Sequence, residues 1–284
     1  MKNVKSYAKI NLSLNLLDRR PDGYHNLDSI MVPIELHDSI LISPLKEYRD
    51  DNFVTVDDFS NGLVHYNLVS HAVKSLTDRY GSTQRFRIYI HKNIPMQAGL
   101  GGGSSNAAFT VKAVNNMLKF NATDEELVKI TTNHGADIPF FISCKPSRCR
   151  GIGEDVTPIT IKNDYYVIIV KPADGCSTKE VFRICDEIGK HQQVDIDKVQ
   201  KALEDGDDEA LCECMGNSLE EAACTLVPEI RVIKGTLQEK GIKLVLMSGS
   251  GSAVFGLSTD KALIKRVAKS LEDVWQVEVS RILK

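Results

Sequence analysis

The stretch "GLGGGSSNAAF", residues 99–109, has the residue types of an anion-binding turn: four glycines in five positions, then two serines. It follows an alternating segment typical of a strand and precedes a segment typical of a helix. Glycines let backbone amides approach an anion, and the first turn of a helix has amides without an intrahelical acceptor. We therefore predict phosphate binding, with a flexible connection as the alternative. No lysine follows the glycines as in Gly-x-x-x-x-Gly-Lys-Ser/Thr, so positive charge must come from elsewhere.

Three charged or amide side chains could complete such a site. Lys9 and Asn11 fall on the same side of an alternating strand predicted over residues 6–17, which is expected to bury one face. That polar side is either a solvated strand face or a cation and an amide that face a substrate. Asp137 follows Gly135 and precedes an apolar run. It either caps a turn or helix, or accepts a proton from a hydroxyl that attacks phosphorus.

Two loops could contact the rest of a ligand. Tyr24 and His25 follow a Pro-Asp-Gly turn, where they either cover the edge of a core or recognise a base by stacking and hydrogen bonding. A second glycine-rich segment, "MSGSGSAVFG" at 247–256, is either a tight turn or a second set of amides near a ligand held by the first turn.

The elements that position these residues form a β-rich first half and a second half of alternating strands and helices. In the first half we predict two strands within 29–43, broken near His37 and Asp38, helices over 67–81 and 105–120, a strand over 85–95, and a helix that starts with the Thr123/Glu126 capping box. In the second half we predict strands over 165–172, 242–258 (interrupted by the loop) and 275–283, and helices over 177–189 and 261–273, with two helical segments in 208–241.

Composition narrows the class of protein. The chain has 284 residues, 42% hydrophobic and 26% charged, which is typical of a globular protein. A net charge of −3 gives no global positive field, so we expect no nucleic-acid partner. Neither a signal peptide nor an apolar stretch of membrane-spanning length occurs, so we expect a cytoplasmic protein with no membrane partner. Seven cysteines without paired spacing indicate free thiols and no metal site.

Together these segments resemble the small-molecule kinase superfamily named after galactokinase, homoserine kinase, mevalonate kinase and phosphomevalonate kinase. Its three motifs occur in order: a lysine-containing N-terminal strand, "IPMQAGLGGGSSNAA" and "MSGSGSAVFG". The resemblance covers essentially the whole chain. It implies an α+β fold with a ribosomal-protein-S5-like N-terminal domain and a ferredoxin-like C-terminal domain, with the site between them. We place these domains at residues 1–158 and 159–284.

Two segments, "AKINLSLNLLDRRPDGYHNLDSIM" and "HGADIPFFI", are similar to one branch of this superfamily. That branch implies ATP-dependent phosphorylation of the 2-hydroxyl of 4-diphosphocytidyl-2-C-methyl-erythritol in the non-mevalonate isoprenoid pathway. ATP and Mg²⁺ are the implied cofactors, and the enzyme would be a monomer or homodimer.

The resemblance also implies roles for individual residues. Lys9 and Asp137 match the catalytic pair. Asn11, Tyr24, His25 and Phe182 match contacts to the substrate, with cytosine near the last three. The residues that match the ATP site are Asn67, Pro95, Gly99, Leu100, Gly101, Gly102, Gly103, Ser104 and Ser105.

The chain departs from the family pattern in several places, and two of these departures remove a charge. Asn106 and Ser218 stand where an aspartate is usual, so two negative charges are missing near the expected nucleotide. Because of these changes, one alternative hypothesis is that the protein is a nucleotide-binding homologue that has lost catalysis. The other alternative is a sister kinase that acts on another small alcohol.

Overall fold

The computed structural model describes residues 1–46, 51–57 and 68–284. The chain divides into two compact units that alternate along the sequence. The first unit comprises residues 1–8, 37–94 and 101–144, and the second comprises residues 9–36, 95–100 and 145–284. Two long paired strands, β1 (Lys2–Arg19) and β2 (His25–Pro44), each contribute a part to both units.

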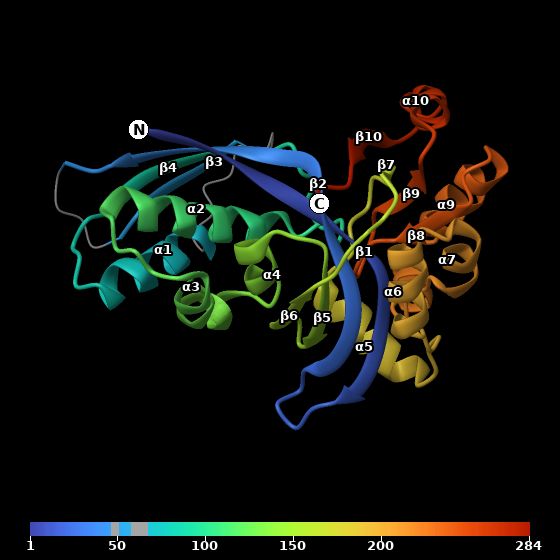
Figure 1. Cartoon of the computed structure of the whole chain (residues 1–284), viewed down its shortest axis with the longest axis horizontal. Helices are drawn as coiled ribbons and strands as arrows, with labels where there is room; N and C mark the ends of the chain where they lie inside the picture. Colours follow the sequence, from blue (N-terminus) through green and yellow to red (C-terminus); the bar gives the residue numbers. More distant parts are fainter. Residues whose placement is uncertain (47–50, 58–67) are drawn as a thin grey trace. The chain divides into compact units, whose positions relative to one another are not determined.

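In the first unit, a sheet is backed by helices (Figure 1). Strand β4 (Phe86–His91) pairs antiparallel with residues 39–44 of β2 and parallel with β3 (Phe53–Asp57). The helices of this unit are α1 (Leu68–Arg79), α2 (Gly102–Leu118), α3 (Asp124–Thr131), the 3-10 helix η1 (Thr132–His134) and α4 (Ile138–Ser143). Helices α1 and α2 pack side by side. The predicted Thr123/Glu126 capping box is present at the start of α3.

The predicted break at His37 and Asp38 is wrong, because β2 runs through both residues. Aspartate disfavours a strand when its carboxylate must reach water or its own backbone. Here the Asp38 carboxylate is fully buried and accepts hydrogen bonds from the amides of Asn93 and Ile94, both at 2.8 Å. Partners from a distant segment thus allow an aspartate inside a continuous strand.

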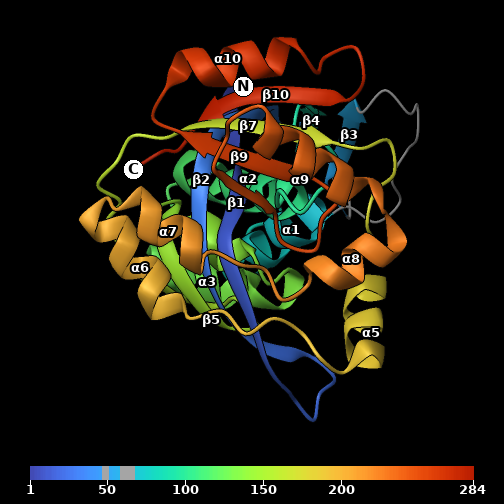
Figure 2. The ribbon, with the colours of Figure 1, turned by 90° about the vertical axis from the view of Figure 1, so that its right-hand side faces the viewer.

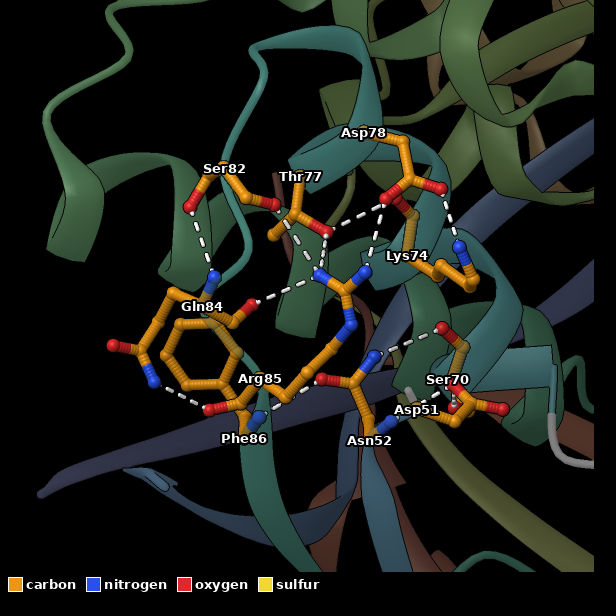
Figure 3. A network of polar contacts seen from close by, with 10 residues as sticks. All are labelled: Asp51, Asn52, Ser70, Lys74, Thr77, Asp78, Ser82, Gln84, Arg85 and Phe86. Atoms are coloured by element: carbon orange, nitrogen blue, oxygen red, sulfur yellow. Dashed lines mark hydrogen bonds and ion pairs between the residues drawn. The ribbon is translucent and has the colours of Figure 1, made fainter. Parts of the chain in front are cut away.

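Arg85 is the centre of a buried polar network elsewhere in the first unit (Figure 3). Its guanidinium donates to Thr77 Oγ1 at 3.0 Å and to the carbonyl of Ser82 at 3.3 Å, and it pairs with Asp78 at 3.1 Å. Asn52 Oδ1 accepts from the amide of Phe86, also in this network. These contacts join α1, the following turn and the starts of β3 and β4.

The second unit contains a four-stranded antiparallel sheet in the order β10-β7-β9-β8. Its strands are β7 (Tyr166–Lys171), β8 (Leu244–Met247), β9 (Val254–Ser258) and β10 (Gln276–Arg281). Helices α9 (Glu229–Glu239) and α10 (Lys261–Lys269) pack against this sheet (Figure 2). The order and the β-α-β-β-α-β path are those of a ferredoxin-like fold, as expected.

The remaining elements of the second unit include several that the sequence did not predict. Strands β5 (Ser147–Gly151) and β6 (Asp155–Pro158) extend the sheet from residues 27–31 of β2. The helices are α5 (Thr178–Ile188), α6 (Ile196–Asp205), α7 (Asp208–Cys214) and α8 (Glu220–Leu226). Residues 208–241 therefore hold three helices (α7, α8 and α9) and not two, because residues 215–219 leave the helix to pair with β1.

Candidate active site

Lys9 and Asn11 lie on the part of β1 that belongs to the second unit. The alternative that these residues lie on a solvated strand face is wrong, since Lys9 is 4% and Asn11 1% exposed. The Lys9 ammonium donates to Asn11 Oδ1 at 2.5 Å, and Asn11 Nδ2 donates to Ser29 Oγ at 2.8 Å. The Ser29 hydroxyl in turn donates to the carbonyl of Ser13. This chain of hydrogen bonds fixes the position of the ammonium.

The second glycine-rich segment contacts this pair directly. Gly249 has a φ of +54°, and a Cβ there would lie 3.1 Å from Asn11 Oδ1 and 3.3 Å from Lys9 Nζ. Ser248 Oγ accepts from the amide of Asn11 at 3.3 Å and donates to the carbonyl of Gly99 at 3.0 Å. The backbone of this loop thus lies so near the pair that a side chain at Gly249 would be crowded.

The two glycine-rich segments are also joined to each other in the second unit. The amides of Ser252 and Ala253 donate to the carbonyls of Gln97 and Ala98, at 3.2 Å and 3.3 Å. Gly99 has a φ of +73°, and a Cβ there would lie 1.9 Å from the carbonyl oxygen of Ser248. Packing against the second loop therefore requires glycine at this position.

A buried thiol lines the same loops. Cys176 donates its backbone amide to the carbonyl of Gln97 at 3.2 Å, and it is 3% exposed. Burial raises the pKa of the Cys176 thiol, with Lys171 opposing that rise. The neutral thiol therefore predominates at neutral pH, which is the state of an inert packing group.

The later part of the glycine-rich turn belongs to the first unit. Helix α2 begins at Gly102, three residues before the predicted Ser105, after Gly101 in the left-handed conformation with φ +69°. The N-cap residue Gly101 has no side chain with which to cap this end of the helix. Ser105 Oγ donates to the carbonyl of Tyr7 at 2.5 Å, which ties the first turns of α2 to β1. Uncapped amides and the helix dipole favour an anion here.

Asp137 occupies the residue before α4, also in the first unit. It has helical backbone angles, and its side chain makes no hydrogen bond that caps α4. Asp137 thus occupies the N-cap position within a turn, as one alternative predicted, although its side chain does not cap the helix. Asp137 belongs to the first unit and Lys9 to the second.

His25 and Phe182 come together in the second unit. Their rings are 5.4 Å apart and tilted by 35°. His25 Nε2 lies 2.7 Å from Asp186 Oδ1, and Arg19 also pairs with that carboxylate at 3.5 Å. Because a carboxylate accepts hydrogen bonds, Nε2 is the donor in this contact, which orients the His25 ring. Tyr24 is 60% exposed, with its ring available for stacking.

Both departures from the family pattern that remove a charge lie at buried positions with polar partners. Asn106 Nδ2 donates to Ser6 Oγ at 2.6 Å and to Asp38 Oδ2 at 2.9 Å. Ser218 Oγ donates to the carbonyl of Gln192 at 2.7 Å and accepts from the amide of Leu16 at 3.0 Å. Each side chain is therefore part of the packing of its own unit.

Sequence reasoning missed Asn217 and Ser248 as residues that support the site. Asn217 Nδ2 donates to the carbonyls of Met247 and Gly249 at 3.0 Å and 2.8 Å, and so holds the second glycine-rich loop. The only local signal was that these are polar residues beside apolar runs.

Asn67, which was expected near the adenine, lies outside the described residues.

The fold and the glycine-rich segments define a two-domain small-molecule kinase. Residues 67–145 match the family described as "GHMP kinases N terminal domain", and residues 199–277 match "GHMP kinases C terminal". A relative from Geobacillus sp. strain WCH70 is 38% identical over 99% of this chain and 96% of its own length. One from Desulfitobacterium hafniense strain Y51 is 37% identical over 93% of this chain and 89% of its own length. Both are named 4-diphosphocytidyl-2-C-methyl-D-erythritol kinase, and this chain belongs to their family within the GHMP kinases.

Solved structures agree with this assignment. A crystal structure of 4-(cytidine 5'-diphospho)-2C-methyl-D-erythritol kinase covers all of both chains, with a TM-score of 0.83 and 28% identity. A homoserine kinase from Cytophaga hutchinsonii aligns with a TM-score of 0.77 over 100% of this chain and 95% of its own, at 17% identity. The second likeness concerns the fold alone.

Among the described residues, every helix is too short or too polar to cross a lipid bilayer.

Proposed function

We propose that the protein transfers the γ-phosphoryl group of ATP to the 2-hydroxyl of 4-diphosphocytidyl-2-C-methyl-D-erythritol, a step of the non-mevalonate route to isoprenoid precursors. The observation that carries this proposal is 38% identity, over 99% of the chain, to a relative named for that kinase. The geometry of the described residues supports it in three ways, which concern the phosphates, the transferred group and the base.

The triphosphate would be held by the glycine-rich turn. Uncapped amides at the start of α2 and the hydroxyl of Ser104 are suitable donors for phosphate oxygens, whereas the Ser105 hydroxyl donates to Tyr7 and holds the turn in place. We propose that Pro95 and residues 99–105 form this part of the ATP site, with Asn67 near the adenine. The helix dipole adds partial positive charge at the same end.

Lys9 and Asp137 are the proposed catalytic residues. Asp137 would accept the proton of the substrate hydroxyl as its oxygen attacks the γ-phosphorus. The new O–P bond forms as the bond to the β-phosphate oxygen breaks, and ADP leaves. The Lys9 ammonium, held by Asn11, would stabilise negative charge on the transferred group.

The cytidyl part would be recognised by Tyr24, His25 and Phe182, and Asn11 would lie near the methylerythritol. The Asp186 carboxylate orients the His25 ring, so that its other nitrogen, Nδ1, could form a hydrogen bond with the polar edge of cytosine. Phe182 beside His25 and the exposed ring of Tyr24 provide faces on which a base can stack.

Mg²⁺ would enter with the nucleotide. Within the part of the chain that the structure describes, no three His, Cys, Asp or Glu side chains are grouped to hold a metal ion. Mg²⁺ commonly binds through substrate phosphates and water with few protein ligands, so the residues present fit a metal delivered on ATP. Bound there, it would neutralise phosphate charge during transfer.

We further propose a domain boundary near residue 158, which falls between the two matched family segments. The enzyme would act in the cytoplasm as a monomer or homodimer, without a nucleic-acid partner.

Measurement of ADP release tests the proposed function. Purified protein with ATP, Mg²⁺ and the cytidyl substrate should form ADP, and omission of the substrate should abolish it. Asp137→Asn should lower kcat about 100-fold or more, because the variant lacks the proton acceptor, while the Kd of an ATP analogue changes little. ADP formation with another small alcohol and none with the cytidyl compound would instead identify a sister kinase. Analogue binding without turnover on any alcohol would indicate a homologue without catalysis.

A further inference from the structure

Asp38 is a fully buried carboxylate to which the proposed reaction assigns no role. Oδ1 accepts hydrogen bonds from two consecutive amides, those of Asn93 and Ile94, each at 2.8 Å. Oδ2 forms an ion pair with Lys92 and accepts from Asn106 Nδ2 at 2.9 Å. One side chain on β2 therefore has four donors, and all of them come from two segments distant in sequence.

Those two segments are the ends of the glycine-rich turn. Residues 92–94 lead directly into it, and Asn106 lies just after it, in the second turn of α2. Asn106 Oδ1 also accepts from the Lys92 ammonium at 3.3 Å, so the two ends are joined to each other as well as to Asp38. Gly102 packs closely on this arrangement, because a Cβ there would lie 3.0 Å from Lys92 Nζ.

The charges of this cluster decide what it can do. The Lys92 ammonium and the Asp38 carboxylate are in contact, so their opposite charges largely cancel beyond the pair. The pair is therefore a poor attractor of anions. Its geometry, in contrast, constrains both ends of the turn whose amides would have to meet phosphate oxygens.

We propose that Asp38 is a positioning residue for the phosphate-binding turn. It holds residues 93–94 and Asn106 at a fixed separation and so sets where the amides of residues 101–104 point. This inference rests on the proposed function, because it assumes that the turn binds ATP. Misplacement of a binding group by about 1 Å costs on the order of 100-fold in rate, so such a constraint matters for phosphoryl transfer.

The test compares Asp38→Asn with a variant that disturbs the same unit elsewhere. In Asp38→Asn, one oxygen still accepts from the two amides, but an NH₂ group faces Lys92 and Asn106, which are donors. Arg85→Met is the control, since it removes a buried guanidinium from the network of Figure 3 without altering any contact of Asp38. Both variants are compared with the wild-type enzyme well below their Tm values.

We expect Asp38→Asn to raise the Kd of a non-hydrolysable ATP analogue and the KM for ATP about 10-fold or more. The KM for the cytidyl substrate should change less than about 2-fold. Arg85→Met should lower Tm and leave both nucleotide constants within about 2-fold of wild type. Lys92→Met combined with Asp38→Asn should restore part of the nucleotide affinity, because it removes one of the two donors that face the new NH₂ group.

A second variant keeps the test decisive if Asp38→Asn does not fold. Asn106→Ala removes the contact on the α2 side and leaves Asp38 with Lys92 and both amides, so the Kd of the analogue should rise about 3-fold to 10-fold. Unchanged nucleotide constants in the folded variants would overturn the positioning role. Failure of the wild-type protein to bind the analogue would instead overturn the proposed function, so the two failures are distinguishable.

Discussion

The two parts of the glycine-rich segment are held in different ways. Residues 95–100 are held mainly by their own backbone, whose carbonyls accept from the second glycine-rich loop. Residues 101–105 form the turn that starts α2, and hydrogen bonds from side chains hold it. Asn106 Nδ2 donates to the Asp38 carboxylate, and Ser105 Oγ donates to the carbonyl of Tyr7. The first part depends on the absence of a Cβ, whereas the second depends on polar groups and their partners. Glycines in one run can therefore have different reasons to be glycine.

Gly99→Ala should have the largest effect on the first part. Its new Cβ would lie 1.9 Å from the carbonyl oxygen of Ser248, in a left-handed backbone. Strain and overpacking together should cost about 2–4 kcal/mol of unfolding free energy, and turnover should fall about 100-fold or more as the loop shifts. Denaturant unfolding and ADP release measure the two effects. A variant with wild-type stability and turnover would show that the backbone contact is dispensable.

Ser248→Ala should have an intermediate effect on the same part. It removes the hydroxyl that donates to Gly99 and accepts from the amide of Asn11. The loss of these contacts should lower the free energy of unfolding by about 1–2 kcal/mol, and kcat should fall because Asn11 holds Lys9. Ser248→Cys is a matched control that keeps a small side chain with a weaker hydrogen bond. An increase in the KM for ATP alone would contradict this assignment.

Gly103→Ala should have the smallest effect on stability and would sharpen the comparison most. A Cβ at this helical position meets no atom within 4 Å, and its φ is not in the left-handed range. Alanine in a helix should therefore stabilise the protein by about 0.5–1 kcal/mol. If the glycine serves phosphate approach, the Kd of an ATP analogue should still rise. A higher Tm with unchanged Kd would show that Gly103 is not needed for the nucleotide.

Local sequence was sufficient for several elements of the fold. The alternation over residues 6–17 predicted β1, the Thr123/Glu126 pair predicted the start of α3, and the apolar run at 165–172 predicted β7. Each of these signals depends on neighbours within a few residues. Short strands such as β5 and β6 were missed, since four or five residues show little periodicity and their partners, β2 for β5 and β5 for β6, are not part of the local pattern.

The candidate site was predictable to a similar extent. Resemblance of motifs indicated Lys9, Asp137 and the glycine-rich turn, and the GHMP kinase family is confirmed by the full-length relatives. The roles of the individual residues stay predictions. The polar residues that support them, Asn217 and Ser248, could not be found because their partners are distant backbone groups.

The sequence alone determined which backbone positions are glycine, which segments alternate, and to which kinase family the motifs belong. Tertiary structure decided that Lys9 and Asn11 are buried on a strand whose pattern also suited a solvated face. It also decided that Asp38 continues a strand in place of ending it. Burial and hydrogen-bond partners come from segments far along the chain, Lys92 being 54 residues from Asp38, and local propensity holds no information about them.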